Sequence, residues 1–268
     1  MNNYAIGVFD SGVGGLTAVR ELNKLLPNEN IIYFGDTARI PYGSRSRETV
    51  LRYANEDIDF LRKHNIKMII AACGTVSSVI GTMSEIDGIP FTGVLLPAAQ
   101  TACSATKNGR IGVIGTPATI RSGAFAKAIK TIRPNTVVFG NACPLFVHLV
   151  ENGYIDRNNQ ITKLVAEEYL EPIKKENVDT LILGCTHYPI IKDIIADYMG
   201  SDVTLISPGE ESAKYAESCL MEKNLLSEST EPGKNTFYVS DSTELFCETA
   251  KIFLGHDVSG EVFSSLEK

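Results

Sequence analysis

The feature that most constrains the fold is an alternation of short apolar runs with longer stretches in which apolar residues recur every three or four positions. Short apolar runs bounded by glycine and polar residues are typical of buried strands, and the longer pattern is typical of amphipathic helices. Strands that alternate with helices form βα units around a parallel sheet. The sequence therefore predicts an α/β fold of mostly parallel sheets flanked by helices.

The expected strands are residues 5–9, 31–34, 68–72, 91–94, 111–114, 137–139, 181–183, 204–206 and 236–239. The expected helices, each with a charged outer face, are residues 16–26, 48–64, 120–133, 161–175, 190–199, 211–225 and 243–253.

A weak internal repeat indicates two similar halves. IGVFDS at 6–11 resembles IGVIGT at 111–116, and ACGT at 72–75 resembles GCTH at 184–187, so both motifs recur about 110 residues later. Helix, strand and helix patterns follow Pro208, and we expect that segment to return to the first half. The predicted domains are residues 1–96 with 208–268, which is discontinuous, and residues 97–207. The active site is expected in the cleft between them.

Charge and hydropathy exclude several classes of protein. The chain of 268 residues carries 25 lysines and arginines against 32 aspartates and glutamates, a net charge of −7, which disfavours nucleic-acid binding. Its longest uninterrupted apolar run, residues 68–73, is far shorter than the about 18 residues of a membrane span. The N-terminus also lacks the basic region of a signal peptide. We expect a cytoplasmic protein with neither nucleic-acid nor membrane partners.

Polar and ionisable residues follow the ends of several expected strands. Asp10 and Ser11 follow the first strand, Asp36 the second, Cys73 the third, and Cys185 a later one. Ligands of open parallel sheets bind outside the carboxyl ends of the strands, where backbone N–H groups are exposed. These residues are therefore the candidates for a binding or catalytic site.

The glycine-rich turn after the first strand does not match a dinucleotide site. Thr17 stands where the third glycine of that motif would be, and no P-loop lysine follows. Gly12, Gly14 and Gly15 then serve to allow a tight turn from strand to helix. Asp10 is either a helix cap or a carboxylate that faces a ligand.

The six cysteines are read as free thiols, because they are scattered and a cytosolic chain of this size needs no disulfide. No C-x-x-C pair is present, so no metal site is predicted. Cys73 and Cys185 each precede an expected helix N-terminus, where the helix dipole is expected to lower the pKa of a thiol. If the two halves face each other, these thiols lie on opposite sides of one ligand. The other four are expected to be packed as small hydrophobic residues: Cys103, Cys143, Cys219 and Cys247.

His187 is the expected proton-transfer partner of Cys185, because imidazole titrates near neutral pH. Asp36 and Glu151 are further candidate carboxylates, with a solvated loop charge as the alternative interpretation of each. His148 is expected to be packed within a helix. His64 and His256 are expected to be structural.

Four sequence blocks, considered together, resemble the glutamate racemases over essentially the whole chain. They are DSGVGGL at 10–16, GDTARIPYG at 35–43, ACGT at 72–75 and GCTHYP at 184–189. The resemblance implies an isomerase that interconverts L-glutamate and D-glutamate without a cofactor or metal and supplies D-glutamate for peptidoglycan. It also implies a homodimer.

The resemblance further implies that Cys73 and Cys185 are the two acid/base residues, assisted by Asp10 and His187 respectively, with Asp36 and Glu151 as supporting carboxylates. The implied substrate-binding residues are Asp10, Ser11, Tyr42, Gly43, Gly74, Thr75, Thr186 and His187.

One departure from the family pattern bears on the substrate. The family usually has Asn after the first cysteine, and this chain has Gly74. A backbone contact survives that change and a side-chain hydrogen bond does not. The alternative within the superfamily is an aspartate racemase or another amino-acid racemase.

Two further alternatives belong to other functional classes. The first is a cysteine hydrolase or amidotransferase with Cys73 as nucleophile, His187 as base and Asp10 as the orienting group. It leaves Cys185 without a task. The second is a non-catalytic amino-acid-binding module of two lobes.

Overall fold

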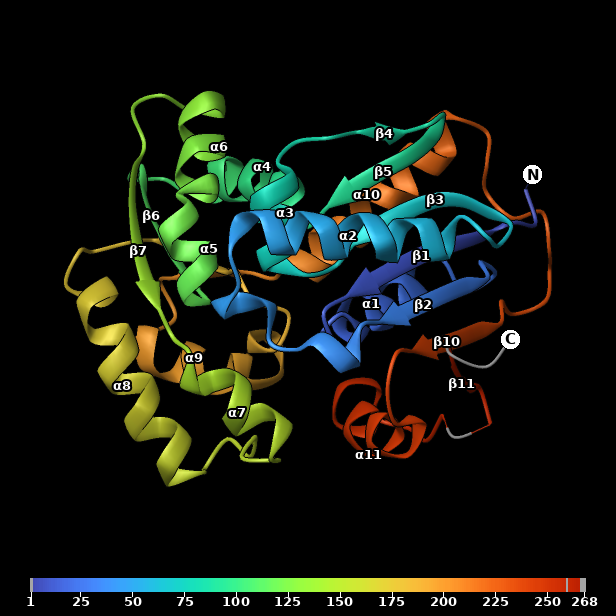
Figure 1. Cartoon of the computed structure of the whole chain (residues 1–268). Coiled ribbons are helices and arrows are strands. Elements are labelled where there is room, and N and C mark those ends of the chain that lie inside the picture. The colour runs from blue at the N-terminus through green and yellow to red at the C-terminus, as the bar shows by residue number, and fades with distance from the viewer. Residues whose placement is uncertain (1, 259, 266–268) are drawn as a thin grey trace.

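Two sheets, each covered by helices, form the framework of the computed structural model (Figure 1). The structure describes residues 2–258 and 260–265. The larger sheet has the strand order β11-β10-β2-β1-β3-β5-β4, and within these residues only the short β4 runs antiparallel to its neighbour. Its strands are β1 (Ala5–Asp10), β2 (Ile31–Gly35), β3 (Ile66–Ala71), β4 (Glu85–Ile86), β5 (Ile89–Gly93), β10 (Asn235–Val239) and β11 (Val262–Ser264).

The smaller sheet is parallel throughout and has the order β7-β6-β8-β9. Its strands are β6 (Arg110–Gly115), β7 (Val137–Ala142), β8 (Thr180–Leu183) and β9 (Thr204–Ile206). In chain order, β2-β1-β3-β5 of the larger sheet and β7-β6-β8-β9 of the smaller sheet follow the same 2-1-3-4 arrangement. This shared topology matches the internal repeat seen in the sequence.

Helices cover both faces of the sheets, so the central strands are buried on both sides and consist of almost continuous apolar runs. The helices are α1 (Leu16–Leu25), α2 (Arg47–Leu61), α3 (Gly74–Ile80), α4 (Leu95–Ala105), α5 (Pro117–Ser122), α6 (Ala124–Ile132), α7 (Leu145–Glu151), α8 (Gln160–Lys174), α9 (Lys192–Met199), α10 (Pro208–Glu222) and α11 (Thr243–Leu254). Three 3₁₀ turns are η1 (Thr37–Arg39), η2 (Tyr42–Ser44) and η3 (Tyr188–Ile191). None of the helices within residues 2–258 and 260–265 is long and apolar enough to cross a membrane.

The α/β prediction is confirmed, and every expected strand is present within a few residues of its expected bounds. The pattern missed α3, α4 and α7, which are short or lack a charged face. The helix expected at 120–133 is two helices, because Gly123 adopts a left-handed conformation (φ +63°) between α5 and α6.

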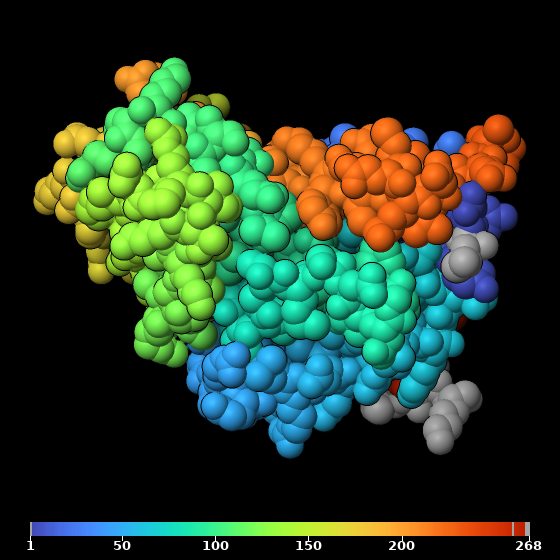
Figure 2. Space-filling model, turned by 90° about the horizontal axis from the view of Figure 1, so that it is seen from above, coloured from blue at the N-terminus to red at the C-terminus, as the bar shows by residue number. Residues whose placement is uncertain are grey.

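The segment after Pro208 returns to the larger sheet. Helix α10 lies against α1, and β10 pairs in parallel with β2. In Figure 2 the orange surface of this segment adjoins both the green and the cyan surfaces of earlier residues. The strands of the larger sheet all lie in residues 1–96 and 208–268, and those of the smaller sheet lie in 97–207. We propose that these ranges are the two domains.

A buried ion pair holds the part of this returning segment that follows α10. The Lys67 ammonium in β3 contacts Glu29 and also donates to the backbone oxygen of Leu225 at 2.7 Å. Glu29 accepts in turn from the backbone N–H of Ser227 at 2.7 Å. Both charges are almost fully buried, and the added hydrogen bonds offset part of their desolvation.

The returning segment predicts a stability test. Phe237 in β10 is fully buried, with its ring centroid 6.1 Å from that of Tyr33 and 6.2 Å from that of Phe246. Phe237→Ala should lower the free energy of unfolding by about 3–5 kcal/mol in urea denaturation, because it leaves a cavity in the core. Phe263→Ala, in the neighbouring strand but 46% exposed, is the matched control and should cost much less. Equal losses would contradict this account of the core.

Candidate active site

A cavity of about 310 Å³ lies where the carboxyl ends of the two sheets meet. It is lined by ten of the twelve residues that the sequence predicted: Ser11, Tyr42, Gly43, Cys73, Gly74, Thr75, Glu151, Cys185, Thr186 and His187. The two that do not line it are Asp10 and Asp36. The cavity therefore collects residues that follow β1, β3 and β8, together with residues of the turn at 42–44 and of α7.

The two thiols occupy equivalent places in the two sheets. Cys73 follows β3 and caps the N-terminus of α3, and Cys185 follows β8, the third strand of the smaller sheet. Both cysteines are buried apart from the surface that they give to the cavity. The Cys73 thiol donates to the Ser11 hydroxyl at 3.7 Å, and the Cys185 sulfur lies 3.8 Å from Nδ1 of His187.

The expectation of a lowered thiol pKa is wrong for Cys73. Burial, and then the negative charge of Asp10, raise the pKa of this thiol to about 12. A helix of seven residues offers only a weak opposing dipole, and the loss of hydration outweighs it. Cys73 is therefore a neutral thiol at neutral pH.

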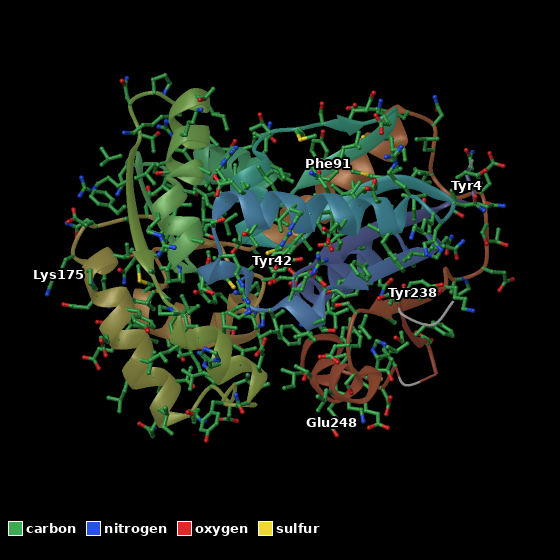
Figure 3. All side chains as sticks on the ribbon, viewed as in Figure 1. Tyr4, Tyr42, Phe91, Lys175, Tyr238 and Glu248 are labelled. Atoms are coloured by element: carbon green, nitrogen blue, oxygen red, sulfur yellow. The ribbon has the colours of Figure 1, made fainter. Side chains whose placement is uncertain are left out.

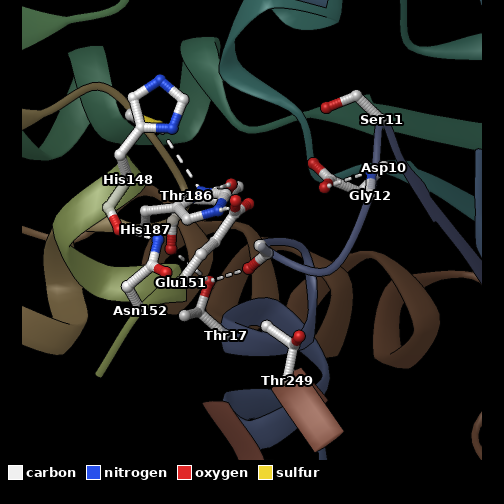
Figure 4. A network of polar contacts seen from close by, with 12 residues as sticks. Asp10, Ser11, Gly12, Thr17, His148, Glu151, Asn152, Thr186, His187 and Thr249 are labelled. Atoms are coloured by element: carbon white, nitrogen blue, oxygen red, sulfur yellow. Dashed lines mark hydrogen bonds and ion pairs between the residues drawn. The ribbon is translucent and has the colours of Figure 1, made fainter. Parts of the chain in front are cut away.

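His187 has a polar partner at each of its ring nitrogens. Its Nε2 lies 2.8 Å from a carboxylate oxygen of Glu151 (Figure 4), and the Cys185 sulfur lies on the side of its Nδ1. Burial lowers the pKa of His187, but the hydrogen bonds to Cys185 and Glu151 raise it to about 10. His187 is then an imidazolium at neutral pH, with both nitrogens as donors.

Asp10 lies behind the cavity wall at the end of β1. One carboxylate oxygen accepts from the backbone N–H of Gly12 at 3.0 Å, and the other is buried without a hydrogen-bond partner among the residues described. Burial raises the pKa of this carboxyl, against the opposing effect of the His187 charge. Asp10 therefore acts on the site through its field on Cys73 and His187.

Asp36 is also withdrawn from the cavity. Its two carboxylate oxygens accept from Arg39, from the hydroxyl of Tyr42 and from the hydroxyl of Ser240. The Tyr42 hydroxyl is thereby turned away from the ligand space, although the residue itself lines the cavity. Asp36 thus lies behind the cavity wall, where its hydrogen bonds to Arg39 and Tyr42 support the segment 36–44.

The glycines of the first turn allow close contact between the two halves of the chain. Gly12, Gly14 and Gly15 all have negative φ, so left-handed turn geometry does not explain them. A Cβ on Gly14 would collide with Thr186 and His187, and one on Gly74 would collide with the backbone oxygen of Gly184. These positions must therefore lack a side chain for the two strand ends to meet as they do.

Comparison with known proteins agrees with this geometry. The sequence model of the Asp/Glu/Hydantoin racemase family matches residues 6–216. The chain belongs to this racemase family. The prediction of a racemase, and hence of an isomerase, is confirmed at the level of the family.

Individual relatives extend over the whole chain. A glutamate racemase of Geobacter metallireducens is 46% identical over 265 residues, which is 98% of this chain and 97% of that protein. The structure of glutamate racemase RacE1 from Bacillus anthracis has a TM-score of 0.93 at 37% identity and covers 98% of both chains. The glutamate racemase of Francisella tularensis in complex with D-glutamate has a TM-score of 0.89 at 41% identity and covers 100% of this chain and 99% of its own.

The sequence analysis of this racemase-family chain missed several cavity residues. The Thr116 hydroxyl lies 3.1 Å from that of Thr75, across the meeting point of the two sheets. Its signal was present, because the repeat aligns Thr116 with Ser11. His148 was expected to be packed, but it is exposed on α7 and lines the cavity. Here the prediction was wrong, because the apolar run around His148 hides which face of α7 is open.

The His187 contacts predict a measurable pKa change. Glu151→Gln should lower the pKa of His187 from about 10 toward its ordinary value, because the neutral amide no longer stabilises the imidazolium. An NMR titration of the histidine ring signals measures this directly. His64, which is packed between the rings of Phe60 and Tyr238, is the internal control and should not move. An unchanged His187 titration would contradict the assigned pair.

The same contact sets the sign of a pH effect on stability. Because the pKa of His187 is raised on folding, its contribution is complete below its ordinary value of 6.5 and is lost as the pH rises through about 10. In the Glu151→Gln variant this loss should be smaller and should end at a lower pH. Urea denaturation between pH 6 and pH 10 measures both curves.

The close approach of the two strand ends predicts an unusual glycine effect. Replacing Gly by Ala within a helix ordinarily stabilises by about 0.5–1 kcal/mol. Gly74→Ala, at the first position of α3, should instead destabilise, because its Cβ meets the oxygen of Gly184. Gly140→Ala in β7, where a Cβ would lie 3.4 Å from Ile120, is the control. A Gly74→Ala protein as stable as its parent in urea would contradict the contact.

Proposed function

We propose that this protein is a glutamate racemase that interconverts L-glutamate and D-glutamate by proton transfer between two cysteines. The observation that carries the proposal is the pair of thiols, Cys73 and Cys185, at equivalent strand ends on one cavity. The relatives named glutamate racemase, which match along almost the entire chain, support glutamate as the substrate.

We assign the two thiols complementary roles in one direction of the reaction. Cys185, beside Nδ1 of His187, acts as a thiolate and removes the proton from Cα. Cys73 is a neutral thiol and delivers its own proton to the opposite face of the resulting carbanion. One C–H bond breaks and another forms, and the configuration at Cα inverts. In the reverse direction the two cysteines exchange roles.

The carbanion needs stabilisation, because the Cα–H of an amino acid is a very weak acid. The cavity wall supplies hydroxyl groups from Ser11, Thr75 and Thr116 and backbone N–H groups at the strand ends. Such preorganised donors around the substrate carboxylate stabilise the charge that develops in the transition state. A cavity enclosed by both halves also excludes water from the reacting atoms.

The geometry bears on the alternative functions. A hydrolase with Cys73 as nucleophile requires His187 beside it, but His187 lies against Cys185. An aspartate racemase keeps all of the chemistry described above and differs only in the length of the substrate, so the assay includes aspartate. A binding module without catalysis gives no role to the paired thiols.

The family resemblance also suggests a cellular location, an oligomeric state and a use for the product. The enzyme would act in the cytoplasm as a homodimer, without an added cofactor, and would supply D-glutamate for peptidoglycan. The substrate is a small amino acid, and neither nucleic acid nor a membrane is required as a partner.

The decisive experiment follows deuterium. Purified protein is incubated with L-glutamate or L-aspartate in D₂O without cofactor. The two enantiomers are then separated, and the deuterium content of each is measured by mass spectrometry. D-glutamate with one deuterium at Cα is the expected product. The absence of both deuterium and D-enantiomer with either substrate would refute the proposal.

Cysteine variants test the two-thiol mechanism in the same assay. Cys73→Ser and Cys185→Ser should each lower turnover by at least about 10³-fold, because a serine hydroxyl is a far weaker acid than a thiol. Cys219→Ser, a half-buried thiol on α10 outside the cavity, is the matched control and should keep normal turnover. Near-normal turnover in either of the first two variants would exclude the mechanism.

A further inference from the structure

A buried polar cluster lies behind the cavity wall, on the side of the segment 36–44 away from the ligand. The outer face of this segment contacts Asp57 of α2 through Arg39 and Tyr42. Its inner face, at Ile40 to Ser44, lines the cavity. Figure 3 shows Tyr42 near the middle of the molecule, whereas Lys175 and Glu248 lie at its edge. The cluster is therefore placed to hold one wall of the substrate site.

If Asp36 and Asp57 are both charged, the cluster lacks a proton for one of the two hydrogen bonds between them and the Tyr42 hydroxyl. The Tyr42 hydroxyl is within hydrogen-bond distance of an oxygen of Asp36 and, at 3.2 Å, of an oxygen of Asp57. A tyrosine hydroxyl has a single proton to donate and can also accept. Its closer contact is to Asp36, so the contact to Asp57 is a good hydrogen bond only if the Asp57 carboxyl donates to the tyrosine oxygen.

The partners of the two aspartates show which one holds the extra proton. Asp36 accepts from Arg39, Tyr42 and Ser240, and three donors satisfy a carboxylate. Asp57 accepts from Arg39 at 3.1 Å through one oxygen, and its other oxygen has only the longer contact to Tyr42, at 3.2 Å. Asp57 is fully buried and close to the charge of Asp36, and these two conditions favour its neutral form over the opposing effect of the Arg39 guanidinium.

We propose that Asp57 is a positioning residue that carries a proton at neutral pH and, by donating it to Tyr42, holds the segment 36–44 in its substrate-binding form. The inference rests on the proposed racemase function, whose wall it supports. Burial and then Asp36 raise the pKa of Asp57 to about 8, in agreement with the hydrogen-bond count. The titratable and charged groups that interact with Asp57 are Tyr33, Asp36, Arg39, Tyr42 and Glu56.

The proposal makes a distinction between two neighbouring aspartates. Asparagine at position 57 reproduces a protonated acid, since its oxygen accepts from Arg39 and its amide donates to Tyr42. Asparagine at position 36 presents an amide to three donors and leaves one of them unpaired. Asp57→Asn should therefore keep the KM and kcat of the parent at pH 7, whereas Asp36→Asn should raise KM.

The dependence of KM on pH distinguishes this role from a merely structural one, which would leave that dependence unchanged. If only the protonated form binds well, about one tenth of the parent protein is competent at pH 9, so KM rises about tenfold from pH 7. Asp57→Asn should lack this rise, and Asp57→Ala should show a raised KM at both values. Asp59→Asn, which changes the same charge at an exposed position on α2, is the matched control and should follow the parent.

The pH dependence of the free energy of unfolding tests the proposal without an activity assay. Because the pKa of Asp57 is raised on folding, the free energy of unfolding should fall as the pH rises from about 4 to about 8. Asp57→Asn should flatten that slope, and Asp59→Asn should not. Identical pH profiles of KM and of stability in the parent and Asp57→Asn would overturn the proposal. If the parent racemises no amino acid, the proposed function fails and the unfolding slopes alone decide the role of Asp57.

Discussion

The site depends on a close approach of backbone to backbone between the two sheets. Gly74 meets the oxygen of Gly184, and Gly14 meets Thr186 and His187, at separations that leave no room for a Cβ. Two hydrogen bonds span the same junction, from Thr17 to the oxygen of Thr186 at 3.1 Å and between Thr75 and Thr116. The equivalent cysteines face a single small cavity because these contacts bring the two strand ends together.

Shared topology does not give the two thiols the same electrostatics. Cys185 has a buried imidazolium beside it, and a carboxylate on α7 holds that cation in place. Cys73 is buried beside Asp10, and burial and then that negative charge oppose its ionisation, outweighing the hydrogen bond to the Ser11 hydroxyl, which lowers its pKa. A two-base mechanism needs one base and one acid at the start of each turnover. The structure thus differentiates the two thiols through positions at which the aligned motifs differ, with His187 aligned to Thr75 and Asp10 to Gly115, and through Glu151, which lies outside them.

The sequence predicted the parts of this architecture that depend on local pattern. Buried parallel strands are continuous apolar runs, so all nine expected strands are present, and the residues that follow β1, β3, β6 and β8 reach the cavity. The sequence pattern gave wrong predictions for properties that depend on tertiary contacts. The pKa of Cys73 depends on how deeply the fold buries it, and the direction of Asp36 depends on Tyr42 and Ser240, which are distant or unpatterned. The spacing of apolar residues along the chain predicts neither the burial of Cys73 nor the hydrogen bonds of Asp36.

The placement of carboxylates follows from the charge of the proposed substrate. Glutamate brings two carboxylates and one ammonium, so an acidic wall would repel it. Among the residues that the structure describes, Glu151 is the one acidic side chain on the cavity, and His187 neutralises it. Asp10 and Asp36 lie behind the wall, where they act through hydrogen bonds and fields. The wall itself presents thiols, hydroxyls and backbone N–H groups, which bind an anion without adding a competing negative charge.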